Sequence, residues 1–135
     1  MQVMNIVNDT PRYNVSTQWK DATDFIHIPN FFIKDQLIDE ITIAGWFKTN
    51  TLNGTAPNMF NYGANEFVRG RIISSTSLWS YWNVNGSKKE ISVNVGKTLN
   101  DNIWHHYAFS FNKGIIKTYV DGILKGTVDH TATGT

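Results

Sequence analysis

The stretch that decides the fold of this chain reads WHHYAFSFNKGIIKTYVDGILKGTV, from Trp104 to Val128. Its Asp121-Gly122 pair lies between two runs rich in β-branched and aromatic residues. Because Asp and Gly accept the positive φ angles of a tight hairpin turn, this pair predicts that 115–120 pairs antiparallel with 123–128. A second turn is predicted just upstream, where Asn112-Lys113-Gly114 combines common turn residues. The stretch therefore predicts a three-stranded antiparallel meander.

Residues 104–111 form the first strand of this predicted meander. Successive side chains of a strand point to opposite faces, so His105 and His106 cannot chelate one metal ion together. We expect one imidazole to be buried and hydrogen-bonded and the other to lie on the opposite face of the sheet. Neither face of the strand is plainly polar, which favours a central position in a sheet.

Short β-rich runs bounded by Asn, Gly, Asp and Ser recur along the rest of the chain. With the meander they give ten expected strands, at 15–19, 25–28, 41–48, 59–62, 68–74, 78–84, 90–95, 104–111, 115–120 and 123–128. Helical periodicity is almost absent, and only residues 35–38 suggest a short helical connector. The chain is thus predicted to be all-β, with a core that includes Trp19, Trp46, Trp82 and Trp104.

Composition narrows the class of protein further. The chain has 135 residues, 41% of them hydrophobic, and no cysteine, so one core must hold a single domain without disulfides. Basic and acidic residues nearly balance at a net charge of +1, and the scattered Lys and Arg argue against nucleic-acid or anionic-membrane partners. No apolar run is long enough for a membrane span, and the first residues lack the pattern of an export signal.

Four motifs in this order resemble the laminin G-like and pentraxin-like branch of the concanavalin A-like lectin/glucanase superfamily. They are ITIAGWFK at 41–48, MFNYG at 59–63, WHHYAF at 104–109 and YVDG at 119–122, preceded by DFIHIP at 24–29. The resemblance implies one jelly-roll sandwich of two antiparallel sheets over residues 1–135. Members of this family usually continue beyond the last strand seen here, so we expect a C-terminally incomplete domain. Its open sheet edge would invite self-association or pairing with a partner chain.

A catalytic role is not supported by the carboxylates. Glucanases of this superfamily carry a Glu-x-Asp-x-x-Glu pattern on one strand, because an acid and a nucleophile must flank the glycosidic bond. The chain has only three glutamates, Glu40, Glu66 and Glu90, and they lie far apart in sequence. It also contains no Gly-x-Ser-x-Gly elbow and no glycine-rich phosphate loop. We therefore expect a non-catalytic protein.

Residues 78–85 carry the pattern of a sugar-binding strand. Alternation places four side chains on one face of this strand: Trp79, Tyr81, Asn83 and Asn85. An aromatic ring covers the apolar face of a sugar while amides exchange hydrogen bonds with its hydroxyls, so this face predicts binding of a glycan or surface polysaccharide. In the alternative interpretation, the aromatic rings pack against the second sheet or a crossing loop.

A second candidate is the pair Arg69 and Arg71, which alternation also places on one strand face. Two guanidinium groups could hold a carboxylate or sulfate of an acidic glycan. They could equally be solvated arginines of an edge strand, where charge discourages aggregation.

The family resemblance also raises calcium as a possible cofactor, since related domains hold it with loop carboxylates, amides and carbonyls. The loop candidates are Asp24, Asp101 and Asn102. Asp121 is not among them, because the hairpin turn already explains it.

The combined prediction is a non-catalytic recognition module, carbohydrate-binding or adhesive, that is extracellular or associated with a virion or cell surface. One alternative is a structural or assembly domain of a phage virion or surface appendage, an expectation that the missing export signal and the early C-terminus favour. A second is a fragment of a glycoside hydrolase whose carboxylates lie in a missing segment. Fold alone does not choose among the three.

Overall fold

The computed structural model describes residues 5–7, 16–18, 40–52, 58–62, 68–84 and 87–131. The chain divides into two compact units, residues 1–37 and 38–135. In the first unit, β1 (Asn5–Val7) pairs antiparallel with β2 (Ser16–Gln18). β2 confirms the centre of the strand predicted at 15–19, whereas β1 was not predicted. The strand predicted at 25–28 and the helical connector at 35–38 lie outside the described residues.

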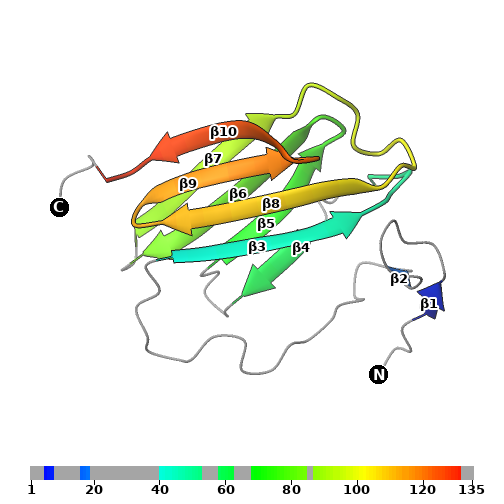
Figure 1. Cartoon of the computed structure of the whole chain (residues 1–135), viewed down its shortest axis with the longest axis horizontal. Helices are drawn as coiled ribbons and strands as arrows, with labels where there is room; N and C mark the ends of the chain where they lie inside the picture. The colour runs from blue at the N-terminus through cyan, green and yellow to red at the C-terminus, as the bar shows by residue number, and fades with distance from the viewer. Residues whose placement is uncertain are drawn as a thin grey trace. The chain divides into compact units, whose positions relative to one another are not determined.

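The second unit contains two four-stranded antiparallel sheets that face each other (Figure 1). Its strands are β3 (Glu40–Phe47), β4 (Asn58–Tyr62), β5 (Val68–Ser74), β6 (Ser77–Val84), β7 (Ser87–Asn94), β8 (His105–Asn112), β9 (Ile115–Val120) and β10 (Ile123–Asp129). Each matches a predicted strand to within a few residues. The described residues include no helix, so the all-β class is confirmed and the arrangement is that of a jelly-roll sandwich.

The first sheet, here called the β8 sheet, has the order β10-β9-β8-β3. Its meander is the predicted one: Asp121 and Gly122 have φ angles of 49° and 77°, and Lys113 and Gly114 have 45° and 94°. Positive φ at both central residues is what a two-residue hairpin loop with the twist of the sheet requires. β3 adds to the other side of β8, so the predicted central position of that strand is confirmed.

The second sheet, here called the β6 sheet, has the order β4-β5-β6-β7 and is a run of neighbouring antiparallel strands. β5 lies between β4 and β6. The interpretation of Arg69 and Arg71 as arginines of an edge strand is therefore wrong. Both lie on an interior strand and are half-buried.

The core lies between the two sheets and follows the alternation of the strands. On β8, His105, Tyr107, Phe109 and Phe111 point inward and are buried. The ring of Phe111 stacks on that of Trp82 from the other sheet, with centroids 4.7 Å apart and planes 5° apart. The buried apolar cluster consists of Val68, Ile72, Leu78, Trp82, Ile91, Val93, Val95, Leu99, Phe109, Phe111, Ile116 and Val120. Burial of this apolar surface is the main term that stabilises the sandwich.

The four tryptophans predicted for the core do not share one environment. Trp82 is buried as expected, and Trp104 is half-buried. Trp46 is 41% exposed, so its prediction is wrong. The reason is alternation on β3, where Phe47 takes the inward position and Trp46 points outward against His106, with ring centroids 5.1 Å apart. Trp19 lies outside the described residues.

Candidate functional site

The outer face of the β6 sheet brings together both groups of candidate ligand-binding residues. In the strand register, Arg71 lies opposite Trp79 and Arg69 lies opposite Tyr81. On the other side of β6, Glu90 lies opposite Tyr81. We call this surface the cationic aromatic face; its described members are Arg69, Arg71, Trp79, Tyr81, Asn83, Lys88 and Glu90. The aromatic strand and the arginine pair were predicted separately, and strand pairing makes them neighbours.

Alternation explains why these side chains point away from the core. Leu78, Ser80 and Trp82 take the inward positions of β6 and are buried, so the residues between them face outward. Trp79 and Tyr81 thus do not pack against the second sheet. They differ in accessibility, because Trp79 is half-buried whereas Tyr81 is only 2% exposed. Of the two rings, Trp79 offers the more accessible surface to a ligand.

Cations surround the accessible ring. The Lys88 ammonium lies 4.7 Å from the centre of the Trp79 ring and 5.1 Å from that of Tyr81. The Arg71 guanidinium lies 5.9 Å from the Trp79 ring. Such cations are attracted by the negative face of an aromatic ring. This surface therefore places positive charge over the ring of a half-buried indole.

Glu90 is the counter-charge described on this face. Its carboxylate lies 2.8 Å from Lys88 Nζ and accepts a hydrogen bond of 3.2 Å from the indole Nε1 of Trp79. The hydrogen bond from Lys88 is the main cause that lowers the pKa of Glu90, against the opposing effect of burial. Glu90 is therefore ionised at neutral pH and orients both the lysine and the indole. Three basic side chains against one acidic side chain leave the described face cationic.

Of the two amide candidates, Asn83 lies within the described residues. Asn83 lies opposite Lys88 in the register. Its Oδ1 is buried, and within the described structure it accepts no hydrogen bond. A buried acceptor of this kind is costly unless a donor reaches it. Asn85, the fourth residue of the predicted strand face, lies outside the described residues.

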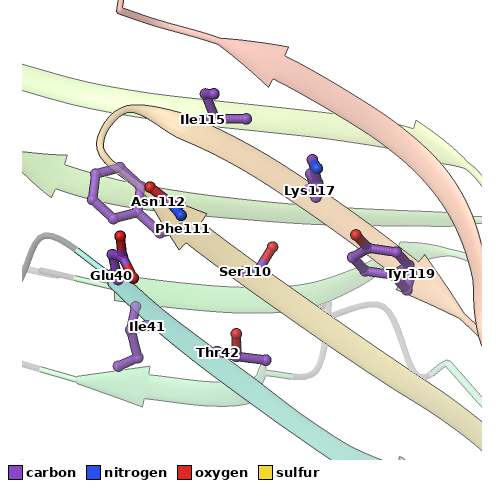
Figure 2. Close-up of a pocket in the computed structure, with 9 residues that line it drawn as sticks. All are labelled: Glu40, Ile41, Thr42, Ser110, Phe111, Asn112, Ile115, Lys117 and Tyr119. Atoms are coloured by element: carbon purple, nitrogen blue, oxygen red, sulfur yellow. The ribbon is translucent and has the colours of Figure 1, made fainter.

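The outer face of the β8 sheet carries a polar hollow that the sequence interpretation missed (Figure 2). Its volume is about 480 Å³. We call it the β8 hollow; it is lined by Glu40, Ile41, Thr42, Ser110, Phe111, Asn112, Ile115, Lys117 and Tyr119. Alternation within each strand marks the polar members as facing outward. Nothing in the linear sequence indicates that three separate strands place them side by side.

A cluster of charged residues around the buried His105 joins the loop before β8 to the hairpin after β9. His105 is 2% exposed, and its Nδ1 lies 3.1 Å from Asp121 Oδ2 while its Nε2 lies 3.0 Å from Asp101 Oδ1. Asp121 also accepts from the backbone N–H of His106, at 2.8 Å, and from Lys97 Nζ. The prediction of one buried, hydrogen-bonded histidine is confirmed, and His106 lies on the opposite face.

The carboxylates of this His105 cluster are ionised at neutral pH. Burial alone would raise the pKa of Asp121, but the hydrogen bonds from Lys97, the His106 backbone and His105 together lower it to about 2. The pKa of Asp101 is also lowered, since the bonds from His105 and Ile103 N–H outweigh its desolvation. Ionised carboxylates only accept hydrogen bonds, so a ring N–H of His105 is the donor wherever the imidazole bonds to one of them.

The calcium candidates do not assemble a ligand set in the described structure. Asp101 is engaged by His105 and by the N–H of Ile103, and Asn102 is exposed with a φ of 63°. Across the described ranges, no group of three His, Asp or Glu side chains could hold a metal ion. Asp24, the third candidate, lies outside those ranges. Calcium binding therefore stays a prediction.

Comparison with protein families gives one match. Residues 20–135 match the model of a laminin G-like family described as the Concanavalin A-like lectin/glucanases superfamily. The match covers all strands of the two sheets and confirms the resemblance predicted from the motifs. Within the residues that the structure describes, there is no helix long and apolar enough to cross a membrane.

Proposed function

This chain belongs to the laminin G-like family of the concanavalin A-like lectin/glucanase superfamily, and from that premise we propose that it is a non-catalytic recognition module for acidic carbohydrate. Laminin G-like domains often bind carbohydrates or other proteins and are typically extracellular or surface-associated. The family is generally non-catalytic, although the superfamily also includes glycosidases. The finer proposal concerns the ligand and the surface that binds it.

The observation that carries the proposal is the placement of two cations around Trp79. Lys88 and Arg71 lie 4.7 Å and 5.9 Å from its ring centre, on one outer face of the sheet. A uronic acid or sulfated sugar combines an apolar C–H face with a nearby negative charge. Such a ligand would place its ring against the indole and its anionic group against the lysine and arginine.

The arrangement of glutamates supports recognition over hydrolysis. Glu40 begins β3 in one sheet, and Glu90 lies on β7 in the other. The hydrophobic core separates the two sheets, whereas glycoside hydrolysis needs two carboxyl groups about 5–10 Å apart around one bond. Glu66 lies outside the described residues. Turnover of a β-glucan by this chain would contradict the non-catalytic proposal.

The test is a glycan array that contains sulfated, uronic-acid and uncharged glycans. We expect the wild-type protein to bind acidic glycans, and we expect Trp79→Ala and Lys88→Ala each to weaken binding by about tenfold or more. Trp46→Ala is the matched control, because it removes an exposed indole from the other sheet. Raising the salt concentration should weaken binding by the wild type, since the exposed charges become screened.

Two results would contradict this proposal. If Trp79→Ala binds acidic glycans as tightly as the wild type, the cationic aromatic face is not the binding surface. If neither protein binds any acidic glycan on the array, recognition of acidic carbohydrate is refuted and assembly becomes the better interpretation.

A second candidate function, assembly through a sheet edge, is favoured by β10. Ile123 and Leu124 at the start of this strand are 59% and 49% exposed, and within the described residues β10 pairs only with β9. An edge strand with exposed apolar residues can pair with another chain. Sedimentation at several protein concentrations tests this, with Leu124→Lys expected to shift the equilibrium toward monomer. A strictly monomeric wild type would rule out self-association.

A further inference from the structure

The β8 hollow lies on the opposite sheet from the cationic aromatic face and is built differently. Three strands contribute to it in two cross-strand rows: Thr42, Ser110 and Lys117 lie opposite one another, and Glu40, Asn112 and Ile115 do the same. Figure 2 shows their polar side chains rising from the same side of the sheet, with Tyr119 beyond Lys117 along β9. Strand pairing therefore brings the lining residues of the hollow together.

Differences in side-chain size explain the depression. The next row on this face places Ala44 opposite Ala108, beside Tyr119. Thr42, Ser110, Ala44 and Ala108 are short, whereas Lys117 and Tyr119 on β9 are long. Short side chains on two strands beside long ones on the third leave a trough along β8. Its volume of about 480 Å³ falls in the range of roughly 300–1,000 Å³ that is usual for small-ligand sites.

The chemistry of the lining is polar but balanced in charge. Glu40 and Lys117 contribute one charge of each sign, and Glu40 lies 4.0 Å from the exposed Lys113. Among the residues that the structure describes, no side-chain hydrogen bond involves the hydroxyls of Thr42 and Ser110 or the amide of Asn112. Hydroxyls and amides of this kind can both donate and accept. Their hydrogen-bond donors and acceptors can therefore bind a ligand that carries many hydroxyl groups and no net charge.

From these features we infer that the β8 hollow is a second ligand site, and that its ligand is an uncharged saccharide. The ligand hydroxyls exchange hydrogen bonds with Thr42, Ser110 and Asn112, and the phenol ring of Tyr119 covers an apolar C–H face. The inference extends the proposed function, because the same module would hold an acidic sugar on one sheet and a neutral sugar on the other. The two sites share no residue, so each can fail without the other.

The test titrates the ¹⁵N-labelled wild type with uncharged hexasaccharides of glucose, galactose, mannose and N-acetylglucosamine. We expect at least one of them to shift backbone amide signals of residues 40–44, 108–112 and 115–119, and to leave those of residues 79–92 unchanged. The affinity should change little between about 50 mM and about 500 mM salt, because no net charge is screened. Acidic glycans on the other sheet should lose affinity over the same range.

Two variants connect the shifts to the hollow. Ser110→Trp fills it from the centre and should weaken binding by about tenfold or more, while Asn112→Ala, at an exposed strand end, should weaken it by about threefold or more. Ser92→Ala removes an exposed hydroxyl from the other sheet and should bind as the wild type does. Thermal unfolding of each variant reports whether it is folded. If Ser110→Trp does not fold, Asn112→Ala still tests the inference.

Three outcomes would overturn the inference: no hexasaccharide binds, the shifts map to other residues, or folded Ser110→Trp binds with wild-type affinity. A hollow that binds only peptides or acidic sugars would also overturn it. If acidic glycans bind through Trp79 while no uncharged saccharide binds, the proposed function stands and only this inference fails. If uncharged saccharides bind in the hollow while Trp79→Ala has no effect on the binding of acidic glycans, this inference stands and the proposed function fails.

Discussion

The imidazole of His105 donates to the carboxylate of Asp121 across 3.1 Å, although the two residues lie sixteen positions apart. Asp121 belongs to the two-residue turn between β9 and β10, and His105 begins β8. The contact therefore locks the hairpin tip to the start of the central strand. Asp101 holds the other ring nitrogen at 3.0 Å and ties in the preceding loop.

Asp121 both forms the hairpin turn and carries the carboxylate that contacts His105 and Lys97. The variant Asp121→Asn separates these two roles. Asn-Gly suits the hairpin turn as well as Asp-Gly does, so the turn should persist. The amide carries no charge for Lys97 and His105, and the buried imidazole loses an ionised partner. We expect the free energy of unfolding, measured by urea titration, to fall by about 1–3 kcal/mol. A variant as stable as the wild type would show that the cluster contributes little.

The same cluster predicts how stability depends on acid pH. The pKa of Asp121 is about 2 in the folded protein against 3.8 ordinarily. Its carboxylate therefore contributes stability above pH 3.8, and this contribution is lost as the pH falls toward 2. The contribution is at most about 2 kcal/mol, because the carboxylate is partly exposed to solvent. Urea titrations from pH 5 to pH 2 should show a steeper decline for the wild type than for Asp121→Asn; parallel curves would contradict this.

At alkaline pH the relevant residue is Tyr107. Burial raises the pKa of its phenol from 10.0 to about 12, and its ring packs against Phe60 and Phe47, with centroids 6.0 Å and 6.2 Å away. The folded state thus keeps the proton that the unfolded state loses, so this contribution to stability is complete below pH 10 and is lost as pH rises through 12.

Tyr107→Phe tests this alkaline effect because it keeps the ring and removes the proton. We expect the unfolding free energy of the variant to fall less between pH 9 and pH 12 than that of the wild type, by about 2 kcal/mol. Ultraviolet titration of the wild type should show one tyrosine that ionises only near the unfolding transition. Equal pH dependence in the two proteins would contradict the assignment.

Gly70 on β5 tests the packing between β5 and its neighbour β4, where Phe60 is the paired residue. A Cβ at this position would come within 2.3 Å and 2.5 Å of ring atoms of Phe60. The ring lies over the glycine, so Gly70→Ala must displace it, and we expect a loss of about 1–3 kcal/mol in unfolding free energy. Adding Phe60→Leu should make the alanine less costly, which a double-mutant cycle measures. Strict additivity of the two changes would argue against contact at this point.

Local features account for most of the fold that could be predicted from the sequence. The alternation of side chains and the Asp121-Gly122 turn each act over a few residues, so strand positions and the meander follow from them directly. The same alternation predicted that His105 and His106 point apart. The prediction that Trp46 lies in the core rested on the apolar character of its indole. Alternation on β3 instead places Trp46 on the exposed face with Glu40 and Thr42, because Ile41, Ile43 and Phe47 occupy the inward positions.

Pairing between distant strands was decided by the tertiary structure alone. Hydrophobic alternation tells each strand which face to bury, but it carries no information about which strand becomes its neighbour. Strand order therefore placed Arg71 beside Trp79, moved the arginines from an expected edge to the interior of a sheet, and gathered Thr42, Ser110 and Lys117 around one hollow. The contact between the Asp121 carboxylate and His105 also depends on strand pairing, because the two residues meet only when β9 lies antiparallel beside β8.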